Sequence, residues 1–212
     1  AGKVILVATD GHRLVRMERT FPGATFPQRE GSIILPRKGI GELKRLLDAL
    51  AKEDGDNKTL QIGFHENHCV VMAGHTVLGM RLIDGTFPDY RQVIPKLADK
   101  VVRVSRPDTV DSLRRVSVLA SDKMQPIKLS LAKDKLVVSC TNPDAGEIQD
   151  DVPVEYGGDD IEVAFNGRYL VDALNSLSDT NVLVKLTDNL SPGLVVGVDE
   201  PHHLCVVMPM RL

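Results

Sequence analysis

The chain has 212 residues, of which 42% are hydrophobic and 26% are charged, and its formal net charge is -3. These values are typical of a globular protein and exclude a bulk polycation, so any contact with nucleic acid would require a local basic surface. No apolar run in the sequence is long enough to cross a membrane as a helix.

Residues 1–90 alternate strand and helix patterns. Two strands are expected within residues 3–20, joined by the Asp10-Gly11 turn, because glycine accepts the positive φ that a tight hairpin requires. Apolar residues at intervals of three and four then predict an amphipathic helix from Ile40 to Leu50 that ends near residues 52–56. Further strands are expected at residues 32–35, 59–64, 69–72 and 76–83, with a linker at residues 87–89.

Residues 100–212 contain the same kinds of element in a longer series. A helix is expected to begin at Arg106-Pro107 and to run to about residue 121, and a second helix is expected from Gly167 to about Leu177. The strands of this part are expected at residues 101–104, 127–131, 135–140, 147–156, 161–165, 182–186, 194–198 and 204–210.

The order strand, helix, three strands recurs along the chain, and an internal repeat of this kind outranks local features in fixing an architecture. The triplet Met-Arg-Leu closes two of these series, at residues 80–82 and 210–212. The pattern predicts an α+β fold with an incomplete unit at residues 1–90 and a complete, duplicated unit at residues 91–212. Because the first unit lacks a strand and a helix, we expect the sequence to be a fragment of a longer chain.

The three cysteines, Cys69, Cys140 and Cys205, each lie among apolar residues in a strand-like setting. Three cysteines cannot all pair with one another. Buried free thiols are typical of a reducing compartment, where disulfides are rare. We therefore expect free thiols and a cytoplasmic protein.

Two histidine clusters have the composition of a metal site, namely residues 65–69 (His-Glu-Asn-His-Cys) and residues 202–205 (His-His-Leu-Cys). A structural zinc site needs four ligands that converge on one point. The first cluster is expected on a hairpin turn, and the second on a strand, where neighbouring side chains point to opposite faces. No C-x-x-C pair supports either cluster, so we expect no metal and no cofactor.

Asp10 and His12 have the composition of an acid–base pair, but no nucleophile motif, Walker loop or Rossmann glycine pattern accompanies them. We therefore interpret residues 9–13 as a turn and expect no enzymatic activity. The alternative is a small α+β ligand-binding or hydrolytic domain that uses Asp10 and His12. A third hypothesis is a stand-alone scaffold with no role on DNA.

The helix predicted from Thr109 has apolar residues outside its core stripe. Val118 and Leu119 lie on either side of the stripe, which indicates a second contact surface. Arg114 and Arg115 also leave the stripe and are either ordinary solvated charges or part of a basic face. The stripe itself consists of Val110, Leu113, Val116 and Ala120.

The sequence ends in an apolar run, Cys205 to Leu212, without a polar tail. Most soluble domains end in a few mobile polar residues. An apolar end of this kind is either the last strand of a core or the wall of a groove that binds a peptide.

Four segments together resemble one family, and they occur in the family's order. They are Ala8 to Leu14 (ATDGHRL), Leu35 to Gly39 (LPRKG), Asp84 to Arg91 (DGTFPDYR) and Val206 to Leu212 (VVMPMRL). The family is the bacterial sliding clamp, the β subunit of DNA polymerase III. The resemblance implies a DNA-clamp fold with three repeated domains, whose helices line a ring around duplex DNA and whose antiparallel sheets form the outer surface. It also implies a processivity factor with neither catalytic activity nor a cofactor.

The resemblance further implies a groove between the second and third domains, where short Gln-Leu-x-Leu-Phe type peptides of the replicative polymerase, the clamp loader and repair proteins dock. Leu14, Val207, Met208 and Met210 are expected to form its apolar pocket, and His12, Arg13 and Arg211 its polar rim. The groove positions implied are Thr9, Gly11, His12, Arg13, Leu14, Pro88, Val93, Met124, Asn166, Tyr169, Leu190, Pro192, Val206, Val207, Met208, Pro209, Met210, Arg211 and Leu212.

The sequence departs from the family in part of this groove. Met124 stands where a larger aromatic residue is expected, and Gln92 where a basic residue is common. Leu190 and Pro192 lie on a matching loop of weaker identity. These departures bear on the affinity for partners more than on function.

Two further surfaces follow from the resemblance. Phosphate contacts without base readout are expected from residues on the helices, and contact with the first domain of the opposite subunit in a homodimeric ring is expected near residue 118. Because this chain has no first domain, we expect it to be monomeric. The DNA-facing residues are Arg37, Lys38, Lys44, Arg45, Arg114 and Arg115, and the subunit-contact residues are Val118, Leu119, Asp144, Glu147 and Asp150.

Overall fold

The computed structural model describes residues 2–22, 32–52, 59–120 and 126–211. The chain divides into two compact units, of which the larger comprises residues 1–22 and 90–212 and the smaller comprises residues 23–89. No helix of the described ranges is long and apolar enough to cross a bilayer.

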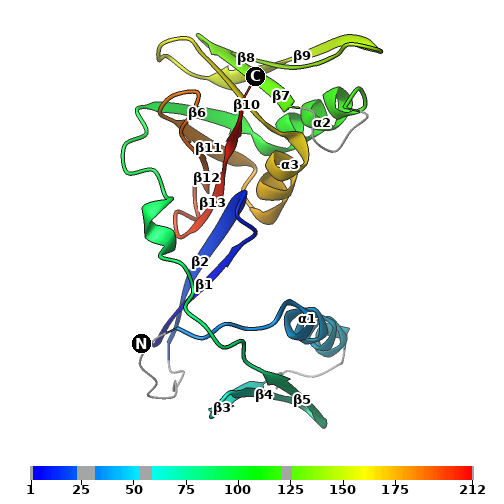
Figure 1. Ribbon diagram of the computed structural model, residues 1–212, viewed down its shortest axis with the longest axis vertical. Helices are drawn as coiled ribbons and strands as arrows, with labels where there is room; N and C mark the ends of the chain where they lie inside the picture. The colour runs from blue at the N-terminus through cyan, green and yellow to red at the C-terminus, as the bar shows by residue number, and fades with distance from the viewer. Residues whose placement is uncertain (1, 23–31, 53–58, 121–125, 212) are drawn as a thin grey trace. The chain divides into compact units, whose positions relative to one another are not determined.

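The larger unit is built on one sheet of eleven antiparallel strands in the order β1-β2-β13-β12-β11-β6-β9-β8-β7-β10-β14 (Figure 1). The long strand β9 joins two arms of the sheet, because its last residues pair with β6 and most of its length pairs with β8. The strands are β1 (Gly2–Thr9), β2 (Arg13–Phe21), β6 (Lys100–Ser105), β7 (Pro126–Ala132), β8 (Lys135–Asn142), β9 (Gly146–Glu155), β10 (Ile161–Asn166), β11 (Asn181–Leu186), β12 (Gly193–Gly197), β13 (His203–Val207) and β14 (Pro209–Met210).

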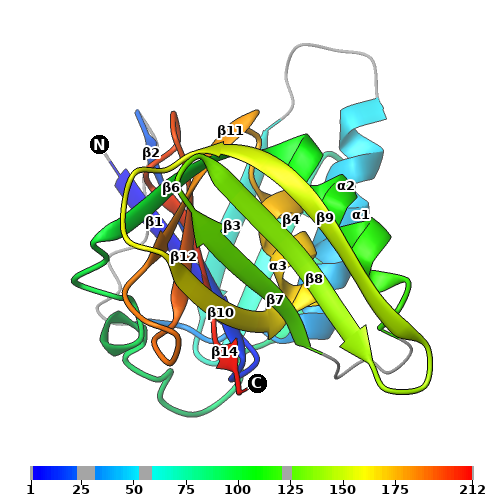
Figure 2. The ribbon, with the colours of Figure 1, turned by 90° about the horizontal axis from the view of Figure 1, so that it is seen from above.

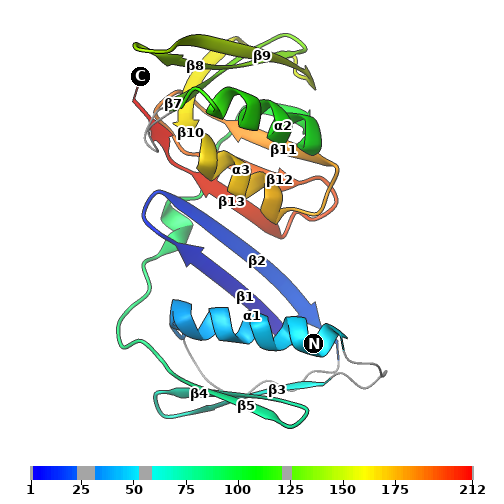
Figure 3. The same ribbon diagram turned by 90° about the vertical axis from the view of Figure 1, so that its right-hand side faces the viewer.

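Two helices, α2 (Arg106–Ser117) and α3 (Gly167–Ser176), lie side by side between the arms of this sheet (Figures 2 and 3). One buried cluster joins both helices to the strands on either side, and its fully enclosed members include Leu113, Phe165 and Val182. The helices begin where expected. α2 ends at Ser117, four residues short of the predicted end at residue 121, which lies outside the described residues.

The N-terminal hairpin β1–β2 belongs to this larger unit. Residues 13–17 of β2 pair with residues 203–207 of β13, so that the two ends of the sequence share one sheet. The sequence repeat assigned this hairpin to the first unit. Only a ladder formed across the chain reveals that it is packed with residues 90–212.

The last strand predicted, at residues 204–210, is two strands in the structure. β13 ends at Val207, and β14 then pairs with β10 on the other arm of the sheet. The change of partner occurs at Met208, whose backbone N–H donates to the carbonyl of His12 at 2.9 Å. Pro209 lacks an N–H and therefore cannot continue the same hydrogen-bond ladder. The C-terminal segment thus crosses from one arm to the other.

The smaller unit consists of α1 (Arg37–Lys52) on the three-stranded antiparallel sheet β3 (Leu60–His65), β4 (His68–Ala73) and β5 (Thr76–Arg81) (Figure 3). Cys69, Val71 and Met80 form its buried centre, against which Leu43 and Leu46 pack. Ile40 and Leu47 are more than two-fifths exposed, so the predicted apolar stripe of α1 is only partly buried.

The strand predicted at residues 32–35 is absent. These residues have no regular secondary structure, and their carbonyl and amide groups form no ladder with a described strand. The described backbone contact is a single hydrogen bond from Ile83 N–H to the Ile34 carbonyl at 2.9 Å. Ile33 and Leu35 still pack against the buried centre, which accounts for the apolar residues at this point in the sequence.

The junction of β12 with the core leaves no room for a side chain at Gly193. A Cβ atom there would lie 2.8 Å from the ring of Phe165 and 3.3 Å from Leu186, both of which are fully buried. We predict that Gly193→Ala lowers the free energy of unfolding by about 1–3 kcal/mol through overpacking. Urea denaturation followed by circular dichroism measures this change.

Gly157→Ala is the matched control, since a Cβ at Gly157 meets no atom within 4 Å. Its stability is expected to stay within about 0.5 kcal/mol of the parent protein. Equal unfolding midpoints for the two variants would show that the Phe165 ring moves aside without lowering the free energy of unfolding.

Candidate functional site

The tip of the β1–β2 hairpin is fixed by its own side chains. Thr9 Oγ1 donates to the carbonyl of Arg13 at 2.8 Å, and Asp10 Oδ1 accepts from the N–H groups of His12 and Arg13 at 3.1 Å each. Gly11 has a φ of +88°, a conformation that residues with a Cβ rarely adopt. The turn predicted from Asp-Gly is confirmed, and it is held in one shape.

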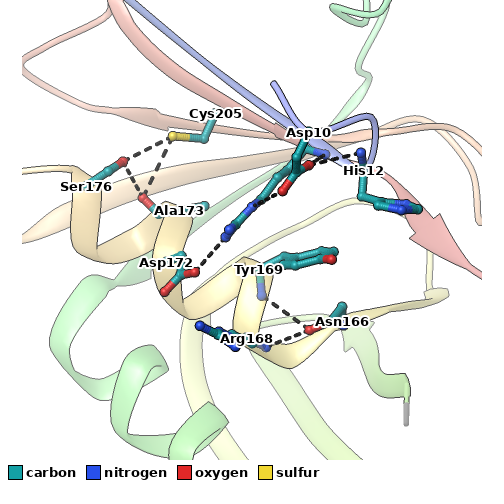
Figure 4. Close-up of polar contacts among 10 residues, drawn as sticks. Asp10, His12, Asn166, Arg168, Tyr169, Asp172, Ala173, Ser176 and Cys205 are labelled. Atoms are coloured by element: carbon teal, nitrogen blue, oxygen red, sulfur yellow. Dashed lines mark hydrogen bonds and ion pairs between the residues drawn. The ribbon is translucent and has the colours of Figure 1, made fainter. Parts of the chain in front are cut away.

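Arg13 connects this turn to α3, from which Tyr169 and Asp172 extend toward the side of Asp10 (Figure 4). Its guanidinium bonds to Asp10 at 3.0 Å and to Asp172 at 2.6 Å. It also lies over the ring of Tyr169, 4.5 Å from the ring centroid, a distance at which a cation is attracted to the aromatic face. On the same side, the rings of His12 and Tyr169 are stacked with their centroids 6.1 Å apart.

The start of α3 is capped by Asn166, whose side-chain oxygen accepts from the N–H groups of Arg168 at 3.0 Å and Tyr169 at 3.4 Å. This cap satisfies two of the donors that a helix leaves free at its first turn. It therefore fixes the direction in which Tyr169 leaves the helix. His12, Arg13, Asn166 and Tyr169, four of the predicted groove residues, are brought together here, and we call them the rim cluster.

Hydrogen bonds set the charge states of Arg13 in the rim cluster and of Asp10 beside it. Burial favours the neutral form of Asp10, but hydrogen bonds from the Arg13 side chain and from the N–H groups of His12 and Arg13 outweigh it and hold the pKa of this carboxyl below its usual value. The two carboxylates that face Arg13 raise the pKa of its guanidinium against the effect of burial. Asp10 is therefore ionised and paired at neutral pH.

The apolar positions of the predicted pocket are divided between two faces of the sheet. Leu14 pairs with Val206, and both side chains join a small buried cluster with Leu194 and Val196. Val207 instead pairs with Arg13 and belongs to the main core. Neighbouring residues of a strand point to opposite faces. The prediction that Leu14 and Val207 line one pocket is therefore wrong, and Val206 is the partner of Leu14.

Met208, between β13 and β14, is 38% exposed, whereas Pro209 and Met210 are half-buried and Arg211 is exposed. Thr9 and Gly11 are exposed at the hairpin tip, as is Val93 after the short helix η1 (Tyr90–Gln92). Leu190 is exposed and Pro192 half-buried on the β11–β12 loop. Pro88 is exposed in the smaller unit, and the predicted groove residues Met124 and Leu212 lie outside the described residues.

The Asp10–His12 pair does not have the geometry of an acid–base pair. Asp10 bonds to the backbone N–H of His12, whose ring faces Tyr169 instead (Figure 4). Asp10 thus stabilises the turn, which disfavours the hydrolytic alternative.

The second histidine cluster lies beneath the rim cluster, at the other end of α3. His203 Nε2 is 3.4 Å from Ser176 Oγ, and Cys205 Sγ is 3.2 Å from the same hydroxyl. Burial lowers the pKa of His203 and raises the pKa of the Cys205 thiol, so both groups are neutral. Within the described ranges no three His, Cys, Asp or Glu side chains are placed to hold a metal ion. All three cysteines are buried and free, as expected.

The basic residues of the helices differ in their pairing. Arg115 bonds to Asp150 of β9 at 2.6 Å, Arg114 lies 3.5 Å from Asp111, and Arg45 lies 2.5 Å from Glu42. The Ser112 hydroxyl and the Arg115 guanidinium face Asp150 and hold its pKa below the usual value. Arg37, Lys38 and Lys44 are exposed and form no ion pair with another described residue. The predicted DNA-facing surface and the predicted subunit-contact surface are therefore linked by one intramolecular ion pair, Arg115–Asp150.

The remaining subunit-contact positions lie at the end of α2 and on the β8–β9 hairpin. Val118 is 83% exposed. Leu119 is half-buried, and its carbonyl accepts from Asn142 Nδ2 at 3.1 Å. Asp144 and Glu147 are exposed at the hairpin.

Two family models match this chain. The central domain of the DNA polymerase III beta subunit matches residues 1–89, and the C-terminal domain of the same subunit matches residues 91–211. The chain belongs to the DNA polymerase III beta subunit family. This result confirms the predicted family and, together with the similar structures below, the α+β clamp fold.

Relatives in the beta subunit family resemble the whole length of this chain. The beta sliding clamp of Vibrio cholerae is 36% identical over 206 residues, which cover 97% of this chain and 54% of the relative. A crystal structure of the Pseudomonas aeruginosa sliding clamp with a ligand superposes with a TM-score of 0.90 at 35% identity, covering 100% of this chain and 56% of that one. A crystal structure of a Bartonella birtlesii sliding clamp bound to griselimycin superposes with a TM-score of 0.89 at 35% identity. The match covers 99% of this chain and 55% of that one. The chain thus spans about half the length of these beta subunits.

The sequence pattern did not identify one residue that contacts the rim cluster. Asp172, which holds Arg13, lies three residues after Tyr169 on α3. Residues three apart on a helix share a face, so the spacing between Tyr169 and Asp172 in the sequence indicates that this carboxylate lies near the predicted groove.

The pKa of Asp10 tests the geometry of the rim cluster. Because this pKa is lowered in the folded protein, Asp10 contributes stability that is present above its usual pKa and is lost as pH falls through the lowered value. We predict that Arg13→Gln moves the pKa of Asp10 upward, since the side-chain hydrogen bond and the cation are both removed. Carboxyl carbon shifts in an NMR titration measure this change.

Asp188 is an internal control in the same titration. Its pKa is lowered mainly by the backbone N–H of Leu190 and by Ser191, which Arg13 does not contact. The pKa of Asp188 is expected to stay constant. If the pKa of Asp10 also stays constant, the ion pair with Arg13 does not exist in solution.

Proposed function

We propose that this chain is part of a bacterial sliding clamp, a non-enzymatic processivity factor that tethers the replicative polymerase to duplex DNA in the cytoplasm. Residues 1–90 would belong to the second clamp domain and residues 91–212 would form the third. The matches to the central and C-terminal domains of the beta subunit support this division. The observation that carries the proposal is the position of Met208 beside the rim cluster, within a chain of this family.

The proposed groove binds short peptides of polymerases, the clamp loader and repair proteins. Its floor is formed by Leu14 and Val206, and Met208 is its adaptable apolar contact, because a thioether side chain fits many shapes. The rim cluster supplies fixed polar groups and an aromatic face beside this apolar surface, the composition of a typical ligand site. Related sliding clamps have been crystallised with a ligand and with griselimycin, which supports ligand binding by members of this family.

The DNA contact is proposed for the exposed cations of the helices. Lys and Arg side chains that face phosphates hold a duplex without reading its sequence. Arg37, Lys38 and Lys44 are available for this role, whereas Arg115 must first leave Asp150. The ring would close in the longer protein through Val118 and Leu119, and this chain alone is proposed to be a monomer.

Substitution of Met208 tests the proposed groove. Met208→Ser is expected to weaken binding of a Gln-Leu-x-Leu-Phe peptide by about thirtyfold, the loss typical of one central apolar contact. Removal of residues 208–212 is expected to weaken it by about a hundredfold or more, although this change also removes the pairing of β14 with β10. Fluorescence polarisation with a labelled peptide measures both affinities.

Met72→Ser is the matched control, because Met72 is an exposed methionine of the smaller unit, with 47% of its surface accessible. Its peptide affinity is expected to equal that of the parent chain. Undiminished binding by a folded Met208→Ser variant would refute the proposed groove.

Affinity across a salt series tests the DNA contact. The chain is expected to bind duplex DNA only in the non-specific range of about 10⁻⁴ to 10⁻⁶ M or more weakly, along a straight line of log affinity against log salt. Arg114→Ala combined with Arg115→Ala should reduce the slope of that line by about one to two, without altering any base preference. Fluorescence anisotropy across a salt series measures the slope.

A control double variant, Lys128→Ala with Lys133→Ala, removes the same charge from the β7 strand and its turn, outside the helices. Its slope is expected to equal that of the parent chain. An equal loss of slope in both double variants would indicate a general charge effect instead of a helical DNA face.

A further inference from the structure

A pocket of about 380 Å³ lies on the larger unit, between the segment that follows η1 and the loop that joins β11 to β12. Two of its lining residues, Val93 and Pro192, are also positions of the proposed groove. The others used below are Ile94, Lys96, Leu97 and Thr187.

Hydrogen bonds between its two walls hold this pocket open in one shape. Thr187 Oγ1 donates to the carbonyl of Leu97 at 2.5 Å, and Lys100 Nζ donates to the carbonyl of Thr187 at 3.3 Å. Within the loop, Asp188 accepts from the N–H groups of Leu190 at 2.8 Å and Ser191 at 2.6 Å. A ligand that enters a preformed pocket loses less free energy to ordering of the protein.

Exposed apolar side chains lie in and beside this pocket. Of its lining residues, Leu97 is 82% exposed and Val93 is 43% exposed, and Leu190, on the loop that carries Thr187 and Pro192, is 70% exposed. A single exposed leucine is common on protein surfaces. Apolar residues gathered around a concave site are typical of a surface that an apolar partner covers.

The charge of the pocket comes from Lys96. This side chain is exposed and forms no ion pair with another described residue. The neighbouring carboxylates are occupied, since Asp99 lies 3.5 Å from Lys100 and Asp188 bonds to its own loop. The pocket therefore presents apolar surface together with one cation that lacks a local counter-charge.

We propose that this pocket is a flanking subsite of the peptide groove and that it takes an aliphatic side chain followed by a carboxylate, from the part of the partner peptide next to the groove motif. The inference rests on the proposed function, because its occupant is a continuation of the peptide that the groove binds. Ile94 lines the pocket and packs against the buried cluster that contains Leu14 and Val206, so the pocket adjoins the proposed groove, and Lys96 favours an acidic flank over a basic one.

The experiment compares three labelled peptides by fluorescence polarisation: the Gln-Leu-x-Leu-Phe core, the same core with Leu-Glu added before it, and the core with Leu-Glu added after it. One of the two extended peptides is expected to bind about tenfold tighter than the core, from partial burial of one leucine and one ion pair. Lys96→Glu and Leu97→Ser should each remove most of this gain and leave the affinity for the core unchanged.

Lys133→Glu and Leu6→Ser are the matched controls, since they make the same changes at an exposed lysine and at a 58% exposed leucine outside the pocket. They should retain the full gain. If the core peptide binds but neither extension adds affinity, or if the gain survives both pocket variants, the flanking subsite is overturned and the groove is retained. If the core peptide itself does not bind the parent chain, the proposed function fails first and the subsite fails with it.

Discussion

The candidate site depends on the ladder between β2 and β13. These two strands come from opposite ends of the sequence, and their pairing from Arg13–Val207 to Met17–His203 sets the position of everything around them. It places Leu14 on Val206, and it brings the hairpin tip close enough to α3 for Arg13 to reach both Asp172 and Tyr169. A slip of one residue would move every side chain of the strand to the other face of the sheet. The register of this ladder therefore determines which side chains make up the site.

The crossing of the chain at Met208 follows from the same ladder. The strand cannot remain beside β2, because residues 10–12 form the turn, and the Met208 N–H instead bonds to the His12 carbonyl at the turn itself. Pro209 and Met210 then find partners in β10, where they close the second arm of the sheet. Met208 is thus held by the backbone on both sides while its side chain stays partly in water. Its exposure is a result of topology and not of a loose terminus.

The sequence predicted the elements well, because the helix and strand periodicities and the Asp-Gly turn are local properties. It predicted less well which residues belong to the site, because this depends on which strands pair with one another. The resemblance named both Leu14 and Val207, yet only the register shows that they face different clusters. The same limit explains the strand expected at residues 32–35: the run from Ile33 to Leu35 is apolar, as in many buried strands, but no ladder forms beside it. It also explains why Arg115 and Asp150 were assigned to separate surfaces when they bind one another.

The two proposed surfaces use charge in opposite ways, and the difference follows from how their ions are held. Arg13 is fixed by two carboxylates and an aromatic ring, so its guanidinium has a defined direction and can orient a peptide. The cations of α1 and α2 that are proposed to face DNA are exposed. Arg115 is held by Asp150 of β9, but Arg114–Asp111 and Arg45–Glu42 are exchangeable pairs that each span three residues of one helix. Exposed pairs of this kind contribute about 0–1 kcal/mol each, so solvent, phosphates and neighbouring carboxylates compete for the same cation on nearly equal terms. A rigid arginine favours recognition of one ligand, whereas exchangeable cations favour contact with phosphates without a preferred position, which is what movement along a duplex requires.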